Sequence, residues 1–305
     1  MSFQSNVGRT LNATPVGRLG FRAARSIVYL ARHIAHPDLP PKLQRSKVDC
    51  RGKQIAIVHR RTPADACVIK QCFPEGQYDM PGGVHGLFID RLYQQIVASG
   101  RQPLIVDCGA NIGASVLWFA HRYPHAHILA IEPAPDNFAI LQRNAANLDV
   151  DLRQAGIAAS DGHAHLTDPD ESSLAYRTCE DGDGPEIVML AIQTLLASKP
   201  VRYQPFILKI DIEGAEKTLF AGDSSSLNCF PLIVMEPHDW MLPGQHTSVE
   251  FFRFHAAAGR EFCMKHENIA SIAFDPSLFD LLTGPTKDLA QRPLTSTPQQ
   301  PSAAV

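Results

Sequence analysis

The stretch LIVDCGANIGAS, residues 104–115, joins an apolar run to an acid and a glycine turn. Its first three residues favour a strand, Asp107 follows them, and Gly109 and Gly113 enclose the turn. Residues 113–123 then have a helical pattern, which ends at Pro124. A strand, a glycine turn and a helix in this order are typical of the first unit of an open α/β sheet.

Short apolar runs alternate with helical patterns after this turn. We predict strands at 104–108, 126–133, 152–158, 205–212 and 230–236, and helices at 113–123, 135–148, 214–221 and 247–258. The last helix begins at Thr247 and Glu250, which have the spacing of a capping box. Residues 261–265 and 269–274 predict a closing antiparallel hairpin. Such alternation predicts a mostly parallel sheet with helices on both faces.

The chain divides into four predicted segments. Residues 1–47 form a basic amphipathic helical segment, 48–100 a strand and helix extension packed on the core, 101–284 the core domain, and 285–305 a disordered tail rich in Pro, Ser and Thr. In the extension, IAIV at 55–58 and CVIKQCF at 67–73 are the predicted strand pieces, and a helix follows from Gly86 to Ser99.

The N-terminal segment is open to three interpretations. Residues 1–36 contain five arginines and no acid, with apolar residues on one helical stripe. A helix of this kind can pack on the domain, contact an anionic membrane surface, or serve as an organelle-targeting segment.

Composition excludes several classes of protein. The 305 residues are 45% hydrophobic with a formal charge of −3, which argues against a dedicated nucleic-acid-binding protein. No apolar run approaches the roughly 18 residues of a membrane span. The seven cysteines are odd in number and form no CxxC pair. We therefore expect free thiols in a reducing compartment and a cytoplasmic protein, peripheral at a membrane if residues 1–36 bind one.

The glycine turn predicts a ligand without a diphosphate. A dinucleotide would require G-x-G-x-x-G, whereas this loop is G-x-x-x-G and follows Asp107, whose carboxylate suits a cationic ligand. Glu132 ends the next strand, where an acid can accept both ribose hydroxyls. A nucleoside with positive charge fits a site of this kind, and S-adenosylmethionine is such a nucleoside. The alternative interpretation is an ordinary turn followed by a surface glutamate. The predicted cofactor-binding residues are Asp107, Gly109, Ala110, Asn111, Gly113, Glu132 and Pro133.

Three stretches carry a resemblance to a known family. VDCGANIGAS, AIEPAPDNFAILQRN and above all LKIDIEGAEKTLF resemble the FkbM family of S-adenosylmethionine-dependent methyltransferases, and IVMEPHDW is similar to its later strand. The resemblance covers about residues 78–273. It implies the class I methyltransferase fold, a Rossmann-like, mostly parallel seven-stranded sheet. It also implies O-methylation of sugars, glycolipids or polyketides. The chain departs from the family at Leu195 and Leu196, where a Leu-Asp pair is common.

The candidate catalytic residues are Asp211, Glu213 and His238. Lys209, Asp211 and Glu213 alternate, so an extended strand would direct all three to one face. Asp211 can act as the base or orient the acceptor. His238 is a second candidate base because imidazole titrates near neutrality, and the alternative is an exposed loop histidine.

Two neighbouring acids are interpreted more simply. Glu216 lies in the first turn of a helix, and we attribute it to the helix dipole. Glu236 can converge with Asp211, Glu213 and His238 around a divalent ion, but their spacing does not require one, and we assign no metal ligand.

The expected acceptor is a hydroxyl group on a small molecule or on a glycan- or lipid-linked substrate. Enzymes that methylate planar amino groups often have a [DNS]-P-P-[YFW] motif after the fourth strand, where this chain has DIEG at 211–214. Trp240 and Phe73 can stack on a sugar ring or simply pack. Two other functions remain open: an inactive binding or assembly domain, and a nicotinamide-dependent oxidoreductase.

Overall fold

The computed structural model describes residues 42–80, 83–167, 177–179 and 184–275. All helices and strands below belong to one compact unit that ends at Ala273. The predictions for residues 1–36 and for the tail at 285–305 lie outside the described residues and stay predictions. Within the described ranges, no helix is both long and apolar enough to cross a membrane.

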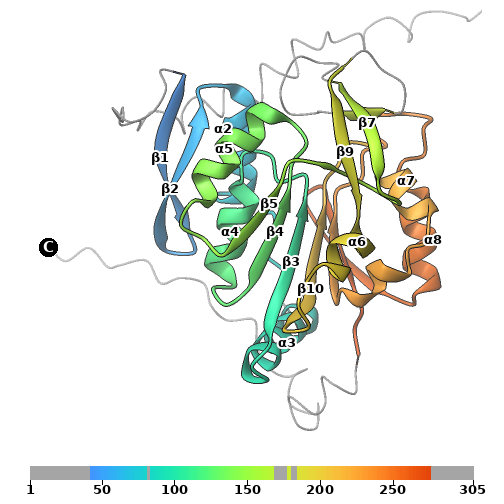
Figure 1. Cartoon of the computed structure of the whole chain (residues 1–305). Coiled ribbons are helices and arrows are strands. Elements are labelled where there is room, and N and C mark those ends of the chain that lie inside the picture. The colour runs from blue at the N-terminus through green and yellow to red at the C-terminus, as the bar shows by residue number, and fades with distance from the viewer. Residues whose placement is uncertain (1–41, 81–82, 168–176, 180–183, 276–305) are drawn as a thin grey trace, which may run out of the picture. The chain divides into compact units, whose positions relative to one another are not determined.

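A seven-stranded sheet forms the centre of the unit (Figure 1). Its spatial order is β12-β13-β11-β10-β3-β4-β5. β13 is antiparallel to both of its neighbours, and the strands from β11 to β5 pair in parallel. The expected sheet with its closing hairpin is therefore confirmed. The strands are β3 (Gln102–Cys108), β4 (His127–Ile131), β5 (Val150–Arg153), β10 (Tyr203–Ile210), β11 (Leu232–Met235), β12 (Glu261–Lys265) and β13 (Asn268–Ile272).

Strand order reverses between β3 and β10, which pair in parallel over Asp107–Lys209 and Cys108–Ile210. From β3 the chain adds β4 and β5 on one side, and from β10 it adds β11 on the other. In open α/β sheets, ligands bind beyond the carboxyl ends of the strands at such a reversal. The topology thus predicts that a ligand binds near the loops after Cys108 and Ile210.

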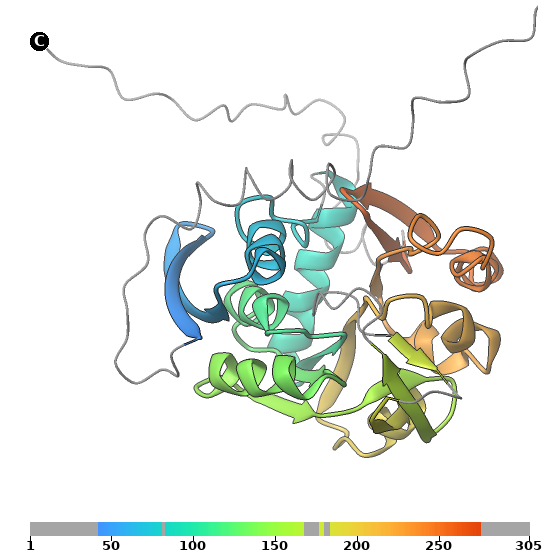
Figure 2. The ribbon, with the colours of Figure 1, turned by 90° about the horizontal axis from the view of Figure 1, so that it is seen from above.

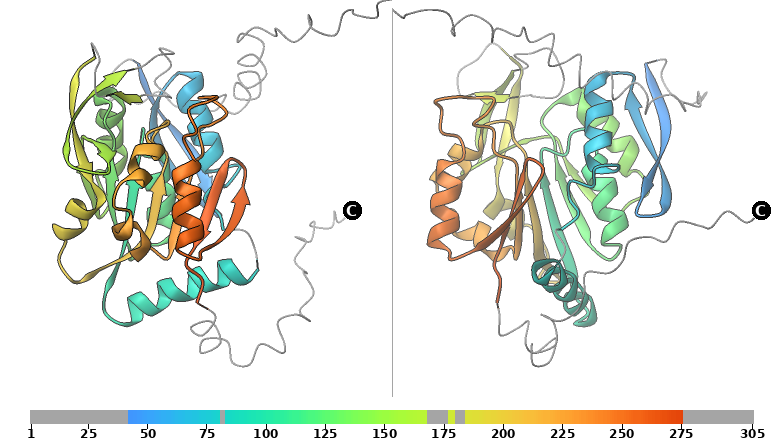
Figure 3. Two further views of the ribbon diagram at one scale, coloured as in Figure 1. Left: turned by 90° about the vertical axis from the view of Figure 1, so that its right-hand side faces the viewer. Right: turned by 180° about the vertical axis from the view of Figure 1, so that it is seen from behind.

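Helices cover both faces of the sheet (Figure 2). One face carries α2 (Pro63–Cys72), α4 (Ala114–Arg122) and α5 (Pro135–Ala145), and the other carries α6 (Ile192–Ala197), α7 (Glu216–Ala221) and α8 (Val249–Ala257). Alternate residues of β3, such as Leu104 and Val106, pack with Phe220 and Phe251 in the core on the second face. α3 (Val84–Ala98) lies at the end of the sheet where β3 begins (Figure 3). A short 3-10 helix, η1 (Ser225–Cys229), precedes β11.

The N-terminal extension differs from its prediction. β1 (Leu43–Cys50) and β2 (Lys53–Arg60) form a separate antiparallel hairpin beside α5, and β1 begins within the segment 1–47. The predicted strand CVIKQCF is wrong, because these residues lie in or next to helix α2. Thr62 caps that helix by accepting a hydrogen bond from the Asp65 N–H, and Pro63 occupies its first turn. These helix-start signals outweigh the β-prone residues.

A second small sheet is formed mostly by residues that had no predicted structure, with 156–158 as the exception. Its order is β6-β9-β7-β8, formed by β6 (Gly156–Ala158), β7 (Gly162–Thr167), β8 (Arg177–Cys179) and β9 (Glu186–Ala191). The single strand predicted at 152–158 is divided between β5 and β6, which belong to different sheets. Leu195 is buried in α6, and Leu196 packs against the same core. The departure from the family pattern there thus serves packing.

The start of α8 also corrects a prediction. Ser248 occupies the cap position without a side-chain hydrogen bond, and the Thr247 hydroxyl is buried with no partner among the described residues. Glu250 pairs with Arg253 on the same helix. The capping box read from Thr247 and Glu250 is therefore absent, although the helix itself is confirmed.

Candidate active site

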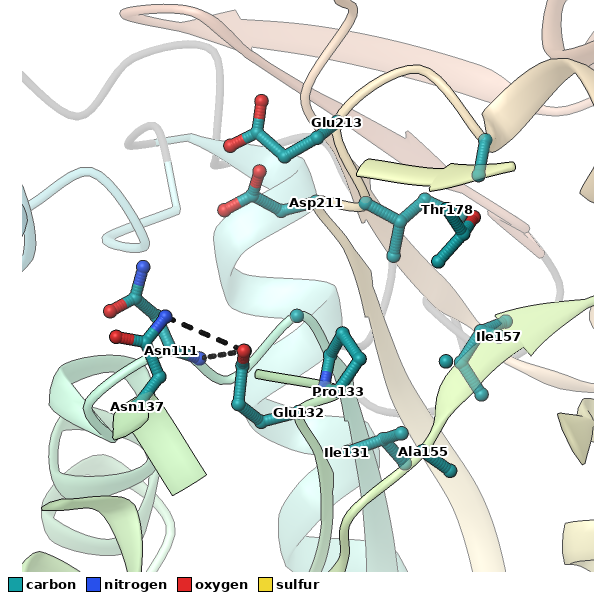
Figure 4. A pocket seen from close by; sticks show the side chains of 14 residues that line it. Asn111, Ile131, Glu132, Pro133, Asn137, Ala155, Ile157, Thr178, Asp211 and Glu213 are labelled. Carbon is teal, nitrogen blue, oxygen red and sulfur yellow. Dashed lines mark hydrogen bonds between the residues drawn. The ribbon is translucent and has the colours of Figure 1, made fainter. Parts of the chain in front are cut away.

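A pocket of about 540 Å³, partly open to solvent, lies at the carboxyl ends of β3, β4 and β10 (Figure 4). The turn after β3, the end of β4, the segment after β10 and the small sheet all contribute to its wall. Of the predicted cofactor-binding residues, Gly109, Asn111, Glu132 and Pro133 line it. Asp107, Ala110 and Gly113 are not among the lining residues.

The glycines of the turn are required by packing. Gly109 has φ +83°, and a Cβ there would lie 1.8 Å from the carbonyl oxygen of Asp211. Gly113 has φ +87°, and its Cβ would lie 2.8 Å from Leu141 Cδ1. Only glycine allows the turn to pack this closely on the chain after β10 and on α5. A Cβ at either position would therefore meet protein atoms, although Gly109 also borders the pocket.

Glu132 is buried and contacts the glycine turn that follows β3. Its carboxylate accepts hydrogen bonds from the backbone N–H of Asn111 at 2.8 Å and of Ala134 at 3.0 Å, and from Asn137 Nδ2 at 3.4 Å (Figure 4). Burial raises the pKa of Glu132 to about 7, although these hydrogen bonds lower it in part. The alternative of a surface glutamate is therefore wrong.

Asp107 does not offer an unpaired charge to a ligand. It is fully buried, accepts a hydrogen bond from Ser115 Oγ at 2.6 Å, and forms an ion pair with Lys209 at 3.1 Å. The prediction that its carboxylate faces a cationic ligand is wrong, because Lys209 already compensates it. A single sequence could not reveal this pairing, which arises across two strands a hundred residues apart.

Lys209 links the two loops that meet at the strand reversal. Its buried ammonium donates to the carbonyl oxygen of Gly109 at 2.6 Å and lies 3.4 Å from Asp211 Oδ2. Burial alone would lower the pKa of Lys209, but Asp107 and Asp211 raise it well above its usual value. It is thus a permanent cation. The signal in the sequence was a lysine within the apolar strand FILKI.

Asp211, Glu213 and His238 come together beside the pocket. His238 Nε2 lies 3.6 Å from Asp211 Oδ1 and 3.4 Å from Glu213 Oε2. β10 ends at Ile210, so strand alternation does not place Glu213. Instead, Glu213 has φ +57° and Gly214 has φ +105°, and this turn returns the carboxylate to the cluster. Burial, and then the charge of Asp211, raises the pKa of Glu213 to about 8.

His238 is a buried residue with a dedicated partner. Only 2% of its surface is exposed, so the alternative of an exposed loop histidine is wrong. Its Nδ1 donates to Glu216 Oε1 at 2.9 Å, and Glu216 is fully buried. The helix dipole is therefore not the main reason for Glu216, which orients His238 instead.

The charge of His238 bears on its predicted role as a base. Burial alone would lower its pKa, but the hydrogen bond and charge of Glu216, with the charges of Asp211 and Glu213, raise it to about 10. In this arrangement the imidazole is protonated at neutral pH and cannot accept a proton. Glu236 Oε1 lies 4.0 Å from Nε2, and burial followed by the charge of Asp211 raises its pKa to about 9.

The two aromatic candidates for stacking differ in exposure. Phe73 is buried and serves packing, whereas Trp240 is 65% exposed in the loop that carries His238. Stacking of Trp240 on a sugar ring of the acceptor therefore stays a prediction.

Comparison with known proteins gives a consistent result. The model of the methyltransferase FkbM domain matches residues 107–269, just over half of the chain. Methyltransferase sdnD of Sordaria araneosa is 32% identical over 171 residues, which cover 45% of this chain and 66% of that protein. Methyltransferase 1 of Beauveria bassiana (strain ARSEF 2860) is 27% identical over 160 residues, with 45% and 64% covered. The chain thus spans about two thirds of the length of these relatives.

Solved structures are more distant. An O-methyltransferase from Bacillus cereus in complex with SAH is 14% identical, with 67% of this chain and 88% of that chain covered and a TM-score of 0.33. The N-terminal domain of human METTL16 in complex with SAH is 10% identical, with 89% and 100% covered and a TM-score of 0.36.

Proposed function

The chain belongs to the FkbM methyltransferase family, and we propose that it transfers a methyl group from S-adenosylmethionine to a hydroxyl oxygen. The acceptor is a small molecule or a glycan- or lipid-linked substrate. One observation carries the proposal: Glu132, on the cofactor side, and Asp211 and Glu213, on the acceptor side, line the same pocket.

The character of the pocket supports a cationic nucleoside. Three of its lining residues are acids, and no Lys or Arg of the described residues is among them. The nearby ammonium of Lys209 is engaged by Asp107 and Gly109. A pyrophosphate would find no cation here, which argues against a nicotinamide dinucleotide.

S-adenosylmethionine, when bound, supplies an electrophilic methyl group on a sulfonium. Gly109, Asn111 and Glu132 are the residues that would hold its nucleoside. Glu132 keeps lone pairs for ribose hydroxyls beyond its three present hydrogen bonds. Hydrogen bonds from the Asn111 N–H to Glu132 and from Lys209 to the Gly109 carbonyl already hold the turn, so little ordering is needed on binding.

Asp211 is the residue we assign to the acceptor. Its side chain is 26% exposed, it borders the pocket, and Lys209 Nζ lies 3.4 Å from one of its carboxylate oxygens. The acceptor oxygen forms a bond to the methyl carbon, the carbon–sulfur bond breaks with its electron pair on sulfur, and Asp211 receives the hydroxyl proton. Proton removal of this kind contributes ~10²- to 10⁴-fold to the rate.

Calorimetry with S-adenosylmethionine tests the cofactor assignment. We expect one binding site per chain, weakened at least ~10-fold in Glu132→Ala and unchanged in Glu186→Ala, an exposed glutamate on β9. Absence of binding at millimolar ligand would contradict the proposal.

Transfer of labelled methyl groups tests the reaction. Cell fractions divided into lipid, glycan, protein and small molecules should show which class is labelled. Asp211→Asn should retain cofactor binding while turnover falls ~10²-fold or more. A wild-type protein that binds the cofactor but labels no fraction would instead indicate an inactive binding domain.

A further inference from the structure

A second feature of the site is the donor set beside the pocket. Asp211, Glu213 and His238 each offer one ligand atom, and these atoms lie within 4.8 Å of one another. The set contains carboxylate oxygens and an imidazole nitrogen, which are common ligands of divalent cations. The cluster therefore combines oxygen and nitrogen donors, as metal sites commonly do.

The spacing suits ligands that share one ion. The separations from His238 Nε2 are 3.6 Å to Asp211 and 3.4 Å to Glu213, too long for good hydrogen bonds. Metal–ligand bonds of about 2.0–2.2 Å place neighbouring ligand atoms about 3.0–3.5 Å apart. Binding of a cation would displace the proton that the His238 imidazole otherwise carries, and small side-chain movements would then bring all three ligands within bonding distance of it.

His238 supplies an independent observation. The side chain is 98% buried, and Nε2 faces the carboxylates without making a hydrogen bond within the described part of the chain. Its other nitrogen, Nδ1, is held at 2.9 Å by the fully buried Glu216. A histidine fixed through one nitrogen by a carboxylate, with the other nitrogen presented to oxygen donors, is the usual arrangement of a metal-binding histidine.

We infer that Asp211, Glu213 and His238 bind a divalent cation, with Glu216 as the residue that positions His238. Two carboxylates favour a hard ion, and the imidazole favours Mn²⁺ over Mg²⁺. The carboxylates of Asp211 and Glu213 also border the pocket, where they lie one above the other and point the same way (Figure 4). An ion held by them would lie at the edge of the pocket, with positions open to ligand oxygen.

The role of the ion rests on the proposed function, whereas its binding does not. An ion that accepts the acceptor oxygen as a ligand would acidify the hydroxyl. Asp211, once a ligand, cannot also remove the proton. The proton would leave to solvent through the open side of the pocket, the acceptor oxygen would bond to the methyl carbon, and the carbon–sulfur bond would break with its electron pair on sulfur.

Binding of Mn²⁺ to the full-length protein tests the site, by electron paramagnetic resonance and by the thermal shift that the ion produces. We expect one ion per chain and a higher Tm at saturating Mn²⁺. Glu213→Gln should lose the shift and weaken binding at least ~10-fold. Glu186→Gln and His125→Gln, exposed residues away from the cluster, should match wild type.

Two further measurements guard against a trivial loss of folding. Glu213→Gln keeps the size of a side chain whose pKa is already raised to about 8, so its Tm without metal should not fall. Glu216→Gln keeps the size of the side chain and should weaken Mn²⁺ binding about 10- to 100-fold, as expected for a residue that only orients a ligand. Equal Mn²⁺ binding by wild type and both variants would overturn the site, as would the absence of binding at millimolar Mn²⁺.

Methyl transfer measured with and without EDTA separates the site from the proposed function. Loss of transfer in EDTA, restored by Mn²⁺, supports the catalytic role. Metal binding with full transfer in EDTA overturns that role and leaves the proposed function intact. Metal binding in a protein that transfers no methyl group supports the site and contradicts the proposed function.

Discussion

Single charged residues at the strand reversal determine how the site is held together. Lys209 is buried between Asp107 and Asp211 and also donates to the Gly109 carbonyl. One ammonium thereby joins the turn after β3 to the end of β10. A buried pair of this kind contributes little net stability, but its loss leaves an uncompensated charge.

The first prediction at this scale concerns Lys209. Lys209→Met leaves Asp107 buried without its partner and should destabilise the protein by about 3–5 kcal/mol in chemical denaturation. The double variant Lys209→Met/Asp107→Asn should recover much of that loss, because no buried charge remains. Lys217→Met, at an exposed position on α7, is the control and should change stability by less than about 0.5 kcal/mol. Equal loss in the single and double variants would contradict the assignment.

The second prediction concerns Glu132 and pH. Its pKa is raised to about 7 in the folded chain, above the unfolded value near 4.5. The folded state therefore binds the proton more tightly, and this contribution to stability is complete below pH about 4.5 and lost as pH rises through about 7. Relative to wild type, Glu132→Gln should thus gain about 2 kcal/mol between pH 5 and pH 8.

Denaturation of both proteins at the two pH values measures this difference. Titration of Glu213, Glu236 and His238 occurs in both proteins and largely cancels from the comparison. A difference in stability that is the same at pH 5 and pH 8 would show that Glu132 titrates normally.

At the scale of elements, the N-terminal hairpin supports the site from outside the matched residues 107–269. Arg60, at the end of β2, pairs with the buried Asp65 at 2.8 Å and with Asp136, and donates to Asn137 Oδ1 at 2.6 Å. Asn137, on α5, in turn donates to Glu132. A chain of contacts thus runs from the hairpin to the carboxylate beneath the glycine turn.

Arg60→Ala tests this connection. Without the guanidinium, Asn137 loses this hydrogen bond to its amide oxygen, and Glu132 is held less firmly. We expect S-adenosylmethionine to bind ~5- to 50-fold more weakly, with a smaller loss in Arg60→Lys. Lys47→Ala, exposed on β1, is the control and should bind like wild type. Unchanged affinity in Arg60→Ala would mean that the hairpin only packs on the domain.

At the scale of the whole molecule, the acidic pocket and the basic N-terminal segment have opposite charge. The core binds a cationic ligand on our proposal, whereas residues 1–36 carry five arginines and no acid. If that segment binds an anionic membrane, it would bring the pocket to lipid-linked acceptors.

Cosedimentation with vesicles tests that role. The full chain should sediment with vesicles that contain anionic lipid, less so at high salt, and deletion of residues 1–36 should abolish sedimentation. Calorimetry with S-adenosylmethionine should give the same affinity for both proteins. Equal sedimentation of the two would contradict membrane binding by this segment.

Local patterns were sufficient for the fold because helix and strand periods are properties of neighbouring residues. The alternation of strands and helices, the closing hairpin, and Glu132 at the end of β4 could all be predicted in this way. Local signals failed where a β-prone composition and a helix-start signal occurred in the same stretch. CVIKQCF is β-prone, yet the cap at Thr62 makes it a helix.

Only the tertiary structure decided what each charged residue does. Asp107 was expected to face a ligand and instead pairs with Lys209, and Glu216 was expected to serve a helix dipole and instead orients His238. The residues of each pair lie far apart in the chain. Burial then makes their pairing decisive, because a charge removed from water must find a partner, and which partner it finds depends on how the strands and loops meet.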